Sequence, residues 1–264
     1  MGEEADPPTR SLPYRGQRLT ISYQKLRKLM QITLNGETID EEAIQLIQAY
    51  EPSEGYYLGF SGGKDSVVIY DLTLRSGVKF DAHYNVSPID PPEIRGFIKE
   101  FYPSIVWDFH ARGFFKMVLS QGLPMRKQRW CCKVIKEAGG VNRLKILGMR
   151  KAESNTRRRY KCFEEQRLQL LPILNWTDAD VWQYILERNL SVCSLYRERF
   201  NRLGCVLCPF LGAKETAFQI RRFPKIAQAW RLASDRYYQK RIERGTPLSW
   251  SSPDEFWNWW IKRK

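Results

Sequence analysis

Apolar and polar residues are arranged along the chain so that strands and helices are predicted to alternate. An apolar run at 56–60 predicts a strand, and it ends in a short polar turn with two adjacent glycines. Apolar positions at helical spacing follow over about 65–75 and stop at Ser76-Gly77, after which 78–86 predicts a second strand. This order predicts a β-α-β unit, whose right-handed crossover places the first turn at the carboxyl end of a parallel sheet.

The remaining pattern continues this alternation and adds helices at both ends of the chain. Two amphipathic helices are expected before the first strand, at 22–30 and 39–50, behind a polar leader over 1–17. The later predicted elements are a helix from Pro91-Pro92 through Phe101, a strand at 105–109, a helix near 113–120, a strand at 144–147, a short strand near 171–174, a helix capped by Thr177, a helix around 213–243, and a helix with Ser252 as its cap and Pro253 in its first turn. The predicted class is therefore α/β with a parallel sheet.

The turn after the first strand has the composition of a phosphate-binding loop. Its residues are Ser61, Gly62, Gly63, Lys64, Asp65 and Ser66. The glycines let the main chain curl, so that the amides of 62–66 converge with the positive end of the helix dipole. Lys64 adds a mobile positive charge, and the two serine hydroxyls can donate to phosphate oxygens. The Walker A pattern is excluded, because an aspartate directly follows the lysine.

The overall charge favours anionic partners. The chain has 43 Lys and Arg against 29 Asp and Glu, a formal net charge of +14. Such an excess favours nucleotides and nucleic acid, although a basic surface can also serve solubility alone. No apolar run approaches the ~20 residues that span a bilayer, and no signal peptide is evident at the N-terminus, so a cytoplasmic protein without a membrane partner is expected.

Four of the six cysteines form two pairs that are expected to meet. The pairs are Cys131-Cys132 and Cys205-x-x-Cys208. Four thiolates can hold an iron-sulfur cluster or Zn²⁺, and free or reversibly oxidised thiols are the third alternative. The vicinal pair is awkward for structural zinc, and the basic residues around both pairs offset the charge of a thiolate-ligated cluster. The expected cofactor is a [4Fe-4S] cluster, ahead of zinc.

Two further sets of candidate residues lie where strands are predicted to end. Asp90 follows the second strand, and the pattern leaves open whether it faces the nucleotide or caps the next helix. Gly148 follows the fourth strand and precedes a group of arginines, which is typical of a ligand-binding edge. Arg150 and Arg157 are the candidates for phosphate contacts, with surface arginines as the alternative.

Three other groups of residues are expected to have structural roles, in helix capping or in packing. Asp178 and Asp180 lie in the first turn of the helix capped by Thr177, where acids complement the helix dipole. Cys162 and Cys193 are expected to be isolated packing residues. The C-terminal tryptophans at 257, 259 and 260 are expected to pack against the body of the protein, with base stacking as the alternative.

Taken together, these motifs resemble the phosphoadenosine phosphosulfate (PAPS) reductase family of PP-loop proteins. The resemblance runs from about Tyr57 to Phe210 through Ser61-Gly62-Gly63-Lys64-Asp65-Ser66, Gly148-x-Arg150-x-x-Glu153-Ser154-x-x-Arg157, Pro172-Ile173-x-x-Trp176-Thr177-x-x-Asp180-Val181-Trp182 and the two cysteine pairs. It implies a Rossmann-like parallel sheet of the adenine nucleotide alpha hydrolase type, with helical N- and C-terminal additions. It also implies nucleotide binding at the matching positions, Glu153 included, and a [4Fe-4S] cluster on the cysteines.

One departure from the family bears on the chemistry. Sulfonucleotide reductases attack the substrate sulfur with a cysteine near the C-terminus, in a Glu-Cys-Gly-Leu-His context, whereas no cysteine follows Cys208 here. The chain is therefore more similar to the ATP pyrophosphatase component of DNA phosphorothioation systems, in which a PP-loop and a cluster are combined for sulfur insertion. That resemblance implies ATP cleavage between the α and β phosphates with Mg²⁺, with Lys64 and Asp65 as catalytic residues.

The expected activity is adenylylation of an acceptor, followed by iron-sulfur-dependent sulfur transfer from a cysteine desulfurase partner. The basic surplus makes nucleic acid the favoured acceptor. A sulfonucleotide reductase that uses another thiol, and a nucleotide-binding module without turnover, are the alternatives. The expected organisation is a leader and helical extension at 1–50, a PP-loop nucleotide-binding domain at 51–190, and a C-terminal Cys-x-x-Cys and helical region at 191–264.

Overall fold

The computed structural model describes residues 38–198 and 200–263, which contain a six-stranded sheet in the order β3-β2-β1-β4-β6-β5. The strands are β1 (Tyr56–Gly59), β2 (Phe80–Asn85), β3 (Val106–Asp108), β4 (Lys145–Ile146), β5 (Phe163–Glu164) and β6 (Gln169–Leu170). β1 pairs parallel with β4, β4 with β6, and β2 with β3, while β5 is antiparallel to β6. The predicted α/β class with a mainly parallel sheet is confirmed. The expected leader and the helix at 22–30 lie outside the described residues.

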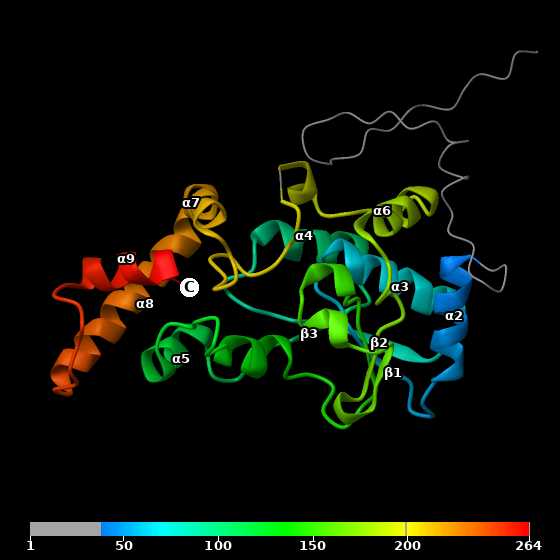
Figure 1. Cartoon of the computed structure of the whole chain (residues 1–264), viewed down its shortest axis with the longest axis horizontal. Coiled ribbons are helices and arrows are strands. Elements are labelled where there is room, and N and C mark those ends of the chain that lie inside the picture. Colours follow the sequence, from blue (N-terminus) through cyan, green and yellow to red (C-terminus); the bar gives the residue numbers. More distant parts are fainter. Residues whose placement is uncertain (1–37, 199, 264) are drawn as a thin grey trace, which may run out of the picture. The chain divides into compact units, whose positions relative to one another are not determined.

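Eight α-helices are described in this part of the chain (Figure 1). They are α2 (Ile39–Ala49), α3 (Lys64–Ser76), α4 (Pro92–Phe101), α5 (Phe114–Gln121), α6 (Asp178–Glu187), α7 (Ala213–Arg222), α8 (Pro224–Glu243) and α9 (Pro253–Arg263). None of the helices within these described residues is long and apolar enough to cross a membrane.

The described chain divides into two compact units, each assembled from two separate segments. The first unit contains the described residues up to Asp81 together with Asn142–Leu203, and so holds β1, β4, β5 and β6 with α2, α3 and α6. The second unit contains Ala82–Val141 and the described residues from Gly204 onwards, and so holds β3 with α4, α5, α7, α8 and α9. The division falls within β2, at Asp81.

The first unit contains the strand and the helix with which the predicted β-α-β pattern begins. β1 is buried, and α3 packs against both α2 and α6 (Figure 1). The apolar face of α3, which includes Val68, Ile69 and Leu72, is fully buried. The helix ends at Gly77, whose φ of 73° is the left-handed conformation that glycine adopts without a Cβ clash. The helix boundaries predicted from the sequence are confirmed here.

The second unit is organised around buried tryptophans. Trp230 on α8 and Trp260 on α9 are both 0% exposed, and their ring centroids lie 4.9 Å apart. Each indole N–H donates to a main-chain carbonyl, Trp230 to Val206 at 3.1 Å and Trp260 to Pro124 at 2.9 Å. Buried indoles usually have a hydrogen-bond partner, and these two contacts join α8 and α9 to the main chain of the same unit. The expectation that the C-terminal tryptophans pack is confirmed for Trp257 and Trp260, which are buried.

Two element predictions are corrected. The helix expected around 213–243 is two helices, α7 and α8, which meet at Pro224. Proline has no amide hydrogen and clashes with the preceding turn, but it fits the first turn of a new helix. The short strand expected near 171–174 is a turn, and the strand is β6, which ends at Leu170.

We predict that Trp230→Ala destabilises the protein by about 3–5 kcal/mol, because a large buried ring and its hydrogen bond are lost together. Leu232→Ala is the matched control, since Leu232 lies on the same helix and is 50% exposed. Guanidinium unfolding followed by circular dichroism measures both changes. Equal stabilities of the two variants would contradict this assignment of the core.

Candidate functional site

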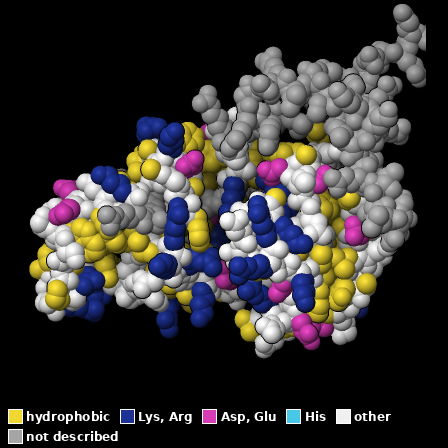
Figure 2. Space-filling view, in the orientation of Figure 1, with side chains coloured by type: hydrophobic (Ala, Val, Ile, Leu, Met, Phe, Trp, Pro, Cys, Tyr) yellow, Lys and Arg dark blue, Asp and Glu magenta, His cyan; other side chains and the backbone are white. Residues whose placement is uncertain are grey.

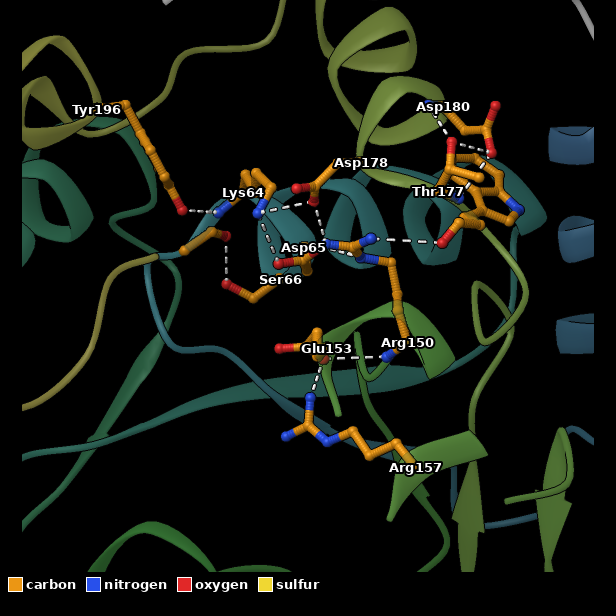
Figure 3. A network of polar contacts seen from close by, with 12 residues as sticks. Lys64, Asp65, Ser66, Arg150, Glu153, Arg157, Thr177, Asp178, Asp180 and Tyr196 are labelled. Atoms are coloured by element: carbon orange, nitrogen blue, oxygen red, sulfur yellow. Dashed lines mark hydrogen bonds and ion pairs between the residues drawn. The ribbon is translucent and has the colours of Figure 1, made fainter. Parts of the chain in front are cut away.

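The loop between β1 and α3 turns sharply at its two glycines. Gly62 has a φ of 74°, and Gly63 is extended at the N-cap of α3. The Ser66 hydroxyl donates to the Gly63 carbonyl at 2.8 Å and lies 3.2 Å from the Ser61 hydroxyl (Figure 3). These contacts hold the loop at the positive end of a helix of 13 residues, where main-chain amides favour an anion.

Lys64 is a buried charge at the start of α3. The residue is 4% exposed, and its Nζ lies 3.5 Å from Asp65 Oδ2 and 3.4 Å from Asp178 Oδ1. Burial raises the pKa of Asp178, but the positive charges of Lys64 and Arg150 more than offset this, and the net pKa is lowered. Lys64 and two carboxylates therefore share one charged region beside the loop.

Arg150 connects the two carboxylates of this charged region. It is 2% exposed, and its guanidinium donates to Asp65 Oδ1 and Asp178 Oδ1, at 2.5 Å each, and to the Trp176 carbonyl at 3.3 Å (Figure 3). A rigid planar group that bridges two carboxylates fixes their separation. In this arrangement Arg150 positions Asp65 and Asp178, and its contact with a phosphate stays a prediction.

Glu153 and Arg157 form the next layer of the network. Arg150 donates its main-chain N–H to Glu153 at 3.0 Å, and the same carboxylate is paired with the Arg157 guanidinium. Burial lowers the pKa of Arg157, and the positive charge of Arg202 adds to this effect. Two neighbouring guanidinium groups make this side of the unit a favourable place for an anion.

Gly148 is required by the close approach of two main-chain segments. A Cβ at this position would lie 2.6 Å from the main-chain oxygen of Asp65 and 2.8 Å from its carbonyl carbon. No side chain fits at that distance from backbone, so the end of β4 can support the loop only with glycine here. The structure thus brings Gly148, Arg150, Glu153 and Arg157 into one network with the loop.

Two residues of this network were missed by sequence reasoning. Asp178 was expected to be structural, but it pairs with Lys64 and Arg150. Asp180 is the structural acid, because it accepts from the Thr177 amide at 2.7 Å and completes the capping box of α6, whose N-cap is Thr177. Tyr196 was not considered, and its hydroxyl accepts a hydrogen bond from the Lys64 amide at 2.8 Å. No local pattern marks Tyr196, because it reaches the loop from 132 residues away.

Asp90 belongs to the second unit and is the centre of a separate network. It is 2% exposed, and its Oδ2 accepts from the Tyr84 hydroxyl at 2.6 Å, the Ser87 amide at 3.1 Å and Lys136 Nζ at 2.5 Å. The Cys205 thiol donates to the other oxygen at 3.4 Å. Pro91, not Asp90, is the N-cap of α4. The predicted role of Asp90 toward a nucleotide stays a prediction.

The cysteines of the two pairs all lie in the second unit, and none of them forms a disulfide within the described residues. A hydrogen bond with Cys132 raises the pKa of Cys131, to which burial and the nearby Cys205 and Cys208 contribute. The same hydrogen bond lowers the pKa of Cys132 to about 7 against the effect of burial. The Cys-x-x-Cys turn is held at Leu207, which has a φ of 57° and donates its amide to Gln219 at 2.8 Å.

The donor chemistry of these thiols suits a soft metal centre. Among the described residues, however, no group of three or more His, Cys, Asp or Glu side chains is placed to hold a metal ion. The ligand set Cys131, Cys132, Cys205 and Cys208 therefore stays a prediction from the sequence. Cys193 is buried, as expected for a packing residue, and Cys162 is partly exposed.

The model of the phosphoadenosine phosphosulfate reductase domain matches residues 55–211, more than half of the chain. The chain belongs to this family. The match covers both the loop and the cysteine pairs.

Individual relatives of this PAPS reductase family chain are distant. The uncharacterized protein MJ0066 of Methanocaldococcus jannaschii is 28% identical over 231 residues, which are 78% of this chain and 46% of that protein. The chain thus spans about half the length of this relative. Adenosine 5'-phosphosulfate reductase 2 of Bacillus subtilis is 25% identical, over 72% of this chain and 87% of that one. The solved PAPS reductase from Candida auris, a phosphate complex, is similar at a TM-score of 0.47 and 15% identity, over 71% and 97% of the two chains.

We predict that Gly148→Ala weakens the binding of inorganic pyrophosphate and ATP by about tenfold or more, because the new methyl group displaces the Asp65 main chain and with it the loop. Gly96→Ala is the control, since a Cβ at Gly96 meets nothing within 4 Å. Calorimetric titration measures the affinities, and circular dichroism checks the fold. An unchanged affinity in a folded Gly148→Ala protein would show that the loop does not depend on this contact.

Proposed function

We propose that this PAPS reductase family protein is an ATP pyrophosphatase that adenylylates an acceptor for iron-sulfur-dependent sulfur transfer, with nucleic acid as the acceptor. The observation that carries the proposal is the position of Lys64. Its charge lies buried at the N-terminus of α3, within 3.5 Å of two carboxylates that Arg150 holds. A cation in this position, at the end of a phosphate cradle, stabilises the charge that develops on departing pyrophosphate.

In the first step an acceptor oxygen attacks the α phosphorus of ATP. The bond from that phosphorus to the bridging oxygen breaks, and pyrophosphate leaves with the electron pair. The amides at the start of α3 and Lys64 hold the departing phosphates. Asp65 is the carboxylate of the loop and offers the oxygen ligands that Mg²⁺ prefers, and a bound Mg²⁺ would neutralise charge on the phosphates.

In the second step sulfide displaces AMP from the adenylylated acceptor. The new bond joins sulfur to the acceptor atom, the acceptor oxygen leaves on AMP, and the step is redox-neutral when sulfur arrives as sulfide. A cysteine desulfurase acting with a thiol reductant is the class of partner that would supply it. The four paired cysteines would hold the [4Fe-4S] cluster on which the sulfur transfer would depend.

The exposed basic residues of the first unit support a nucleic-acid acceptor. Arg157–Arg159 forms a short 3₁₀ turn, in which Arg158 and Arg159 are exposed, and Lys161 follows. The Arg167 guanidinium lies 4.7 Å from the centroid of the Tyr160 ring. In Figure 2, Lys and Arg side chains gather on the visible surface of this unit, with a few acids among them. Such a surface suits a sugar-phosphate backbone, and stacked aromatic and arginine groups suit bases.

A sulfonucleotide reductase is the second candidate, and the similarity to adenosine 5'-phosphosulfate reductase 2 favours it. That activity needs a thiolate nucleophile, and residues 209–264 of this chain contain no cysteine. A nucleotide-binding module without turnover is the third candidate. An adenylylating ATP pyrophosphatase releases pyrophosphate from ATP, and a sulfonucleotide reductase releases sulfite from PAPS with thioredoxin. A nucleotide-binding module does neither.

We predict that the protein releases pyrophosphate from ATP and that Lys64→Ala lowers the rate by about 100-fold or more, because the stabilisation of the leaving group is lost. The assay is run without oxygen, with single-stranded and double-stranded DNA and RNA offered as acceptors. Lys99→Ala is the control, since Lys99 is an exposed lysine of α4. Retained activity in Lys64→Ala, or sulfite release from PAPS in place of pyrophosphate release, would refute the proposal.

We predict that anaerobically purified protein is brown and carries about four irons per chain, as a [4Fe-4S] cluster requires. Cys205→Ser should lose most of the iron and the visible absorption, because a hydroxyl is a poor ligand for a soft metal. Cys162→Ser, a matched change outside the two pairs, should keep both. A colourless protein that contains zinc, or equal iron in the two variants, would overturn the proposed ligand set.

A further inference from the structure

We propose that Tyr196 is a phosphate-binding residue, whose hydroxyl accepts the Lys64 amide hydrogen and donates its own hydrogen to a phosphate oxygen of the bound nucleotide. The inference rests on the proposed binding of nucleotide phosphates at residues 61–66. It adds to the loop a donor that comes from a distant part of the chain.

The hydroxyl of Tyr196 lies directly over the loop (Figure 3). Its oxygen is 2.8 Å from the Lys64 main-chain nitrogen, which is one of the first amides of α3. It also lies 3.5 Å from the place where a Cβ on Gly63 would be. An anion bound by the amides at this helix end would therefore lie next to the phenolic oxygen.

The Tyr196 hydroxyl has a hydrogen that it can donate to a ligand. A tyrosine hydroxyl has one hydrogen to donate besides the lone pairs with which it accepts. Tyr196 is 4% exposed, and within residues 38–198 and 200–263 no acceptor receives its hydrogen. Buried polar hydrogens normally have an acceptor, so the site lacks one group. A phosphate oxygen in the cradle would be that acceptor.

The ring of Tyr196 is held in place, so its hydroxyl is aimed before any ligand arrives. The residue lies in the 3₁₀ turn Ser194–Glu198, where Leu195 is fully buried. Its ring meets that of Trp182 edge to face, with centroids 5.2 Å apart. Burial raises the pKa of Tyr196, so the hydroxyl keeps its hydrogen at neutral pH. A fixed donor costs little entropy when the ligand binds.

The same geometry allows an opposite role, in which the hydroxyl only masks the Lys64 amide. The two roles predict opposite changes in anion affinity when the Tyr196 hydroxyl is removed. If Tyr196 donates to the phosphate, loss of the hydroxyl weakens anion binding. If it masks the amide, loss of the hydroxyl exposes a donor and strengthens anion binding.

The test compares wild-type protein with Tyr196→Phe by calorimetric titration with inorganic pyrophosphate and with ATP. We expect affinities about 10- to 100-fold weaker in the variant, since a hydrogen bond to a charged group is lost. Tyr184→Phe is the matched control and should bind as the wild type does. Tyr184 is also a buried tyrosine of the first unit, and its hydroxyl contacts Asp71 and Arg75, not the loop.

Equal or tighter binding by a folded Tyr196→Phe protein would overturn the inference while the proposed function stands. Wild-type protein that binds neither pyrophosphate nor ATP would remove the proposed function and the inference together. A crystal structure of the wild type with pyrophosphate supplies a second readout that needs no variant. The inference requires the Tyr196 oxygen within hydrogen-bond distance of a phosphate oxygen there, and a separation beyond about 3.5 Å would overturn it.

Discussion

The burial of the Lys64 ammonium at the positive end of a helix is the constraint around which the first unit is organised. Removing an ammonium from water costs on the order of several kcal/mol, and the helix dipole at this end opposes a cation. Two carboxylates, on Asp65 and Asp178, lie within 3.5 Å and offset both effects. A charge held in this way supports the proposed binding of phosphate, because an anion entering the loop would meet positive groups that need no rearrangement.

The carboxylates of Asp65 and Asp178 are held in position by residues from other parts of the first unit. Arg150 bridges them from the end of β4, Glu153 holds the Arg150 main chain, and Gly148 lets β4 approach the loop. Through these contacts the Gly-x-Arg-x-x-Glu motif has a structural role that does not depend on contact with a ligand. Its members determine the position of the loop and the balance of charge around it.

The second unit follows the same physical rule with different residues. A buried carboxylate, Asp90, is stabilised by the Tyr84 hydroxyl, the Lys136 ammonium and a main-chain amide. It also accepts from Cys205, one of the four cysteines proposed to hold the cluster. In each unit a buried charged group therefore lies at the proposed functional residues: Lys64 at the loop in the first unit, and Asp90 beside Cys205 in the second. The aromatic packing of Trp230 and Trp260 forms the core of the second unit.

Local patterns in the sequence were sufficient for most of the helices, for the first four strands and for the polar turn after β1. Helix α3, its end at Gly77, the start of α4 at Pro92 and the cap of α6 at Thr177 follow from spacing and capping chemistry, which act within a few residues. The break at Pro224 was also available from the sequence and was overlooked. Tertiary structure alone decided the partners: Asp178 with Lys64, Arg150 with two acids, and the Tyr196 hydroxyl with the loop amide. Such pairings join residues up to 132 positions apart, and nothing within a local stretch records which distant side chain will satisfy a buried charge or amide.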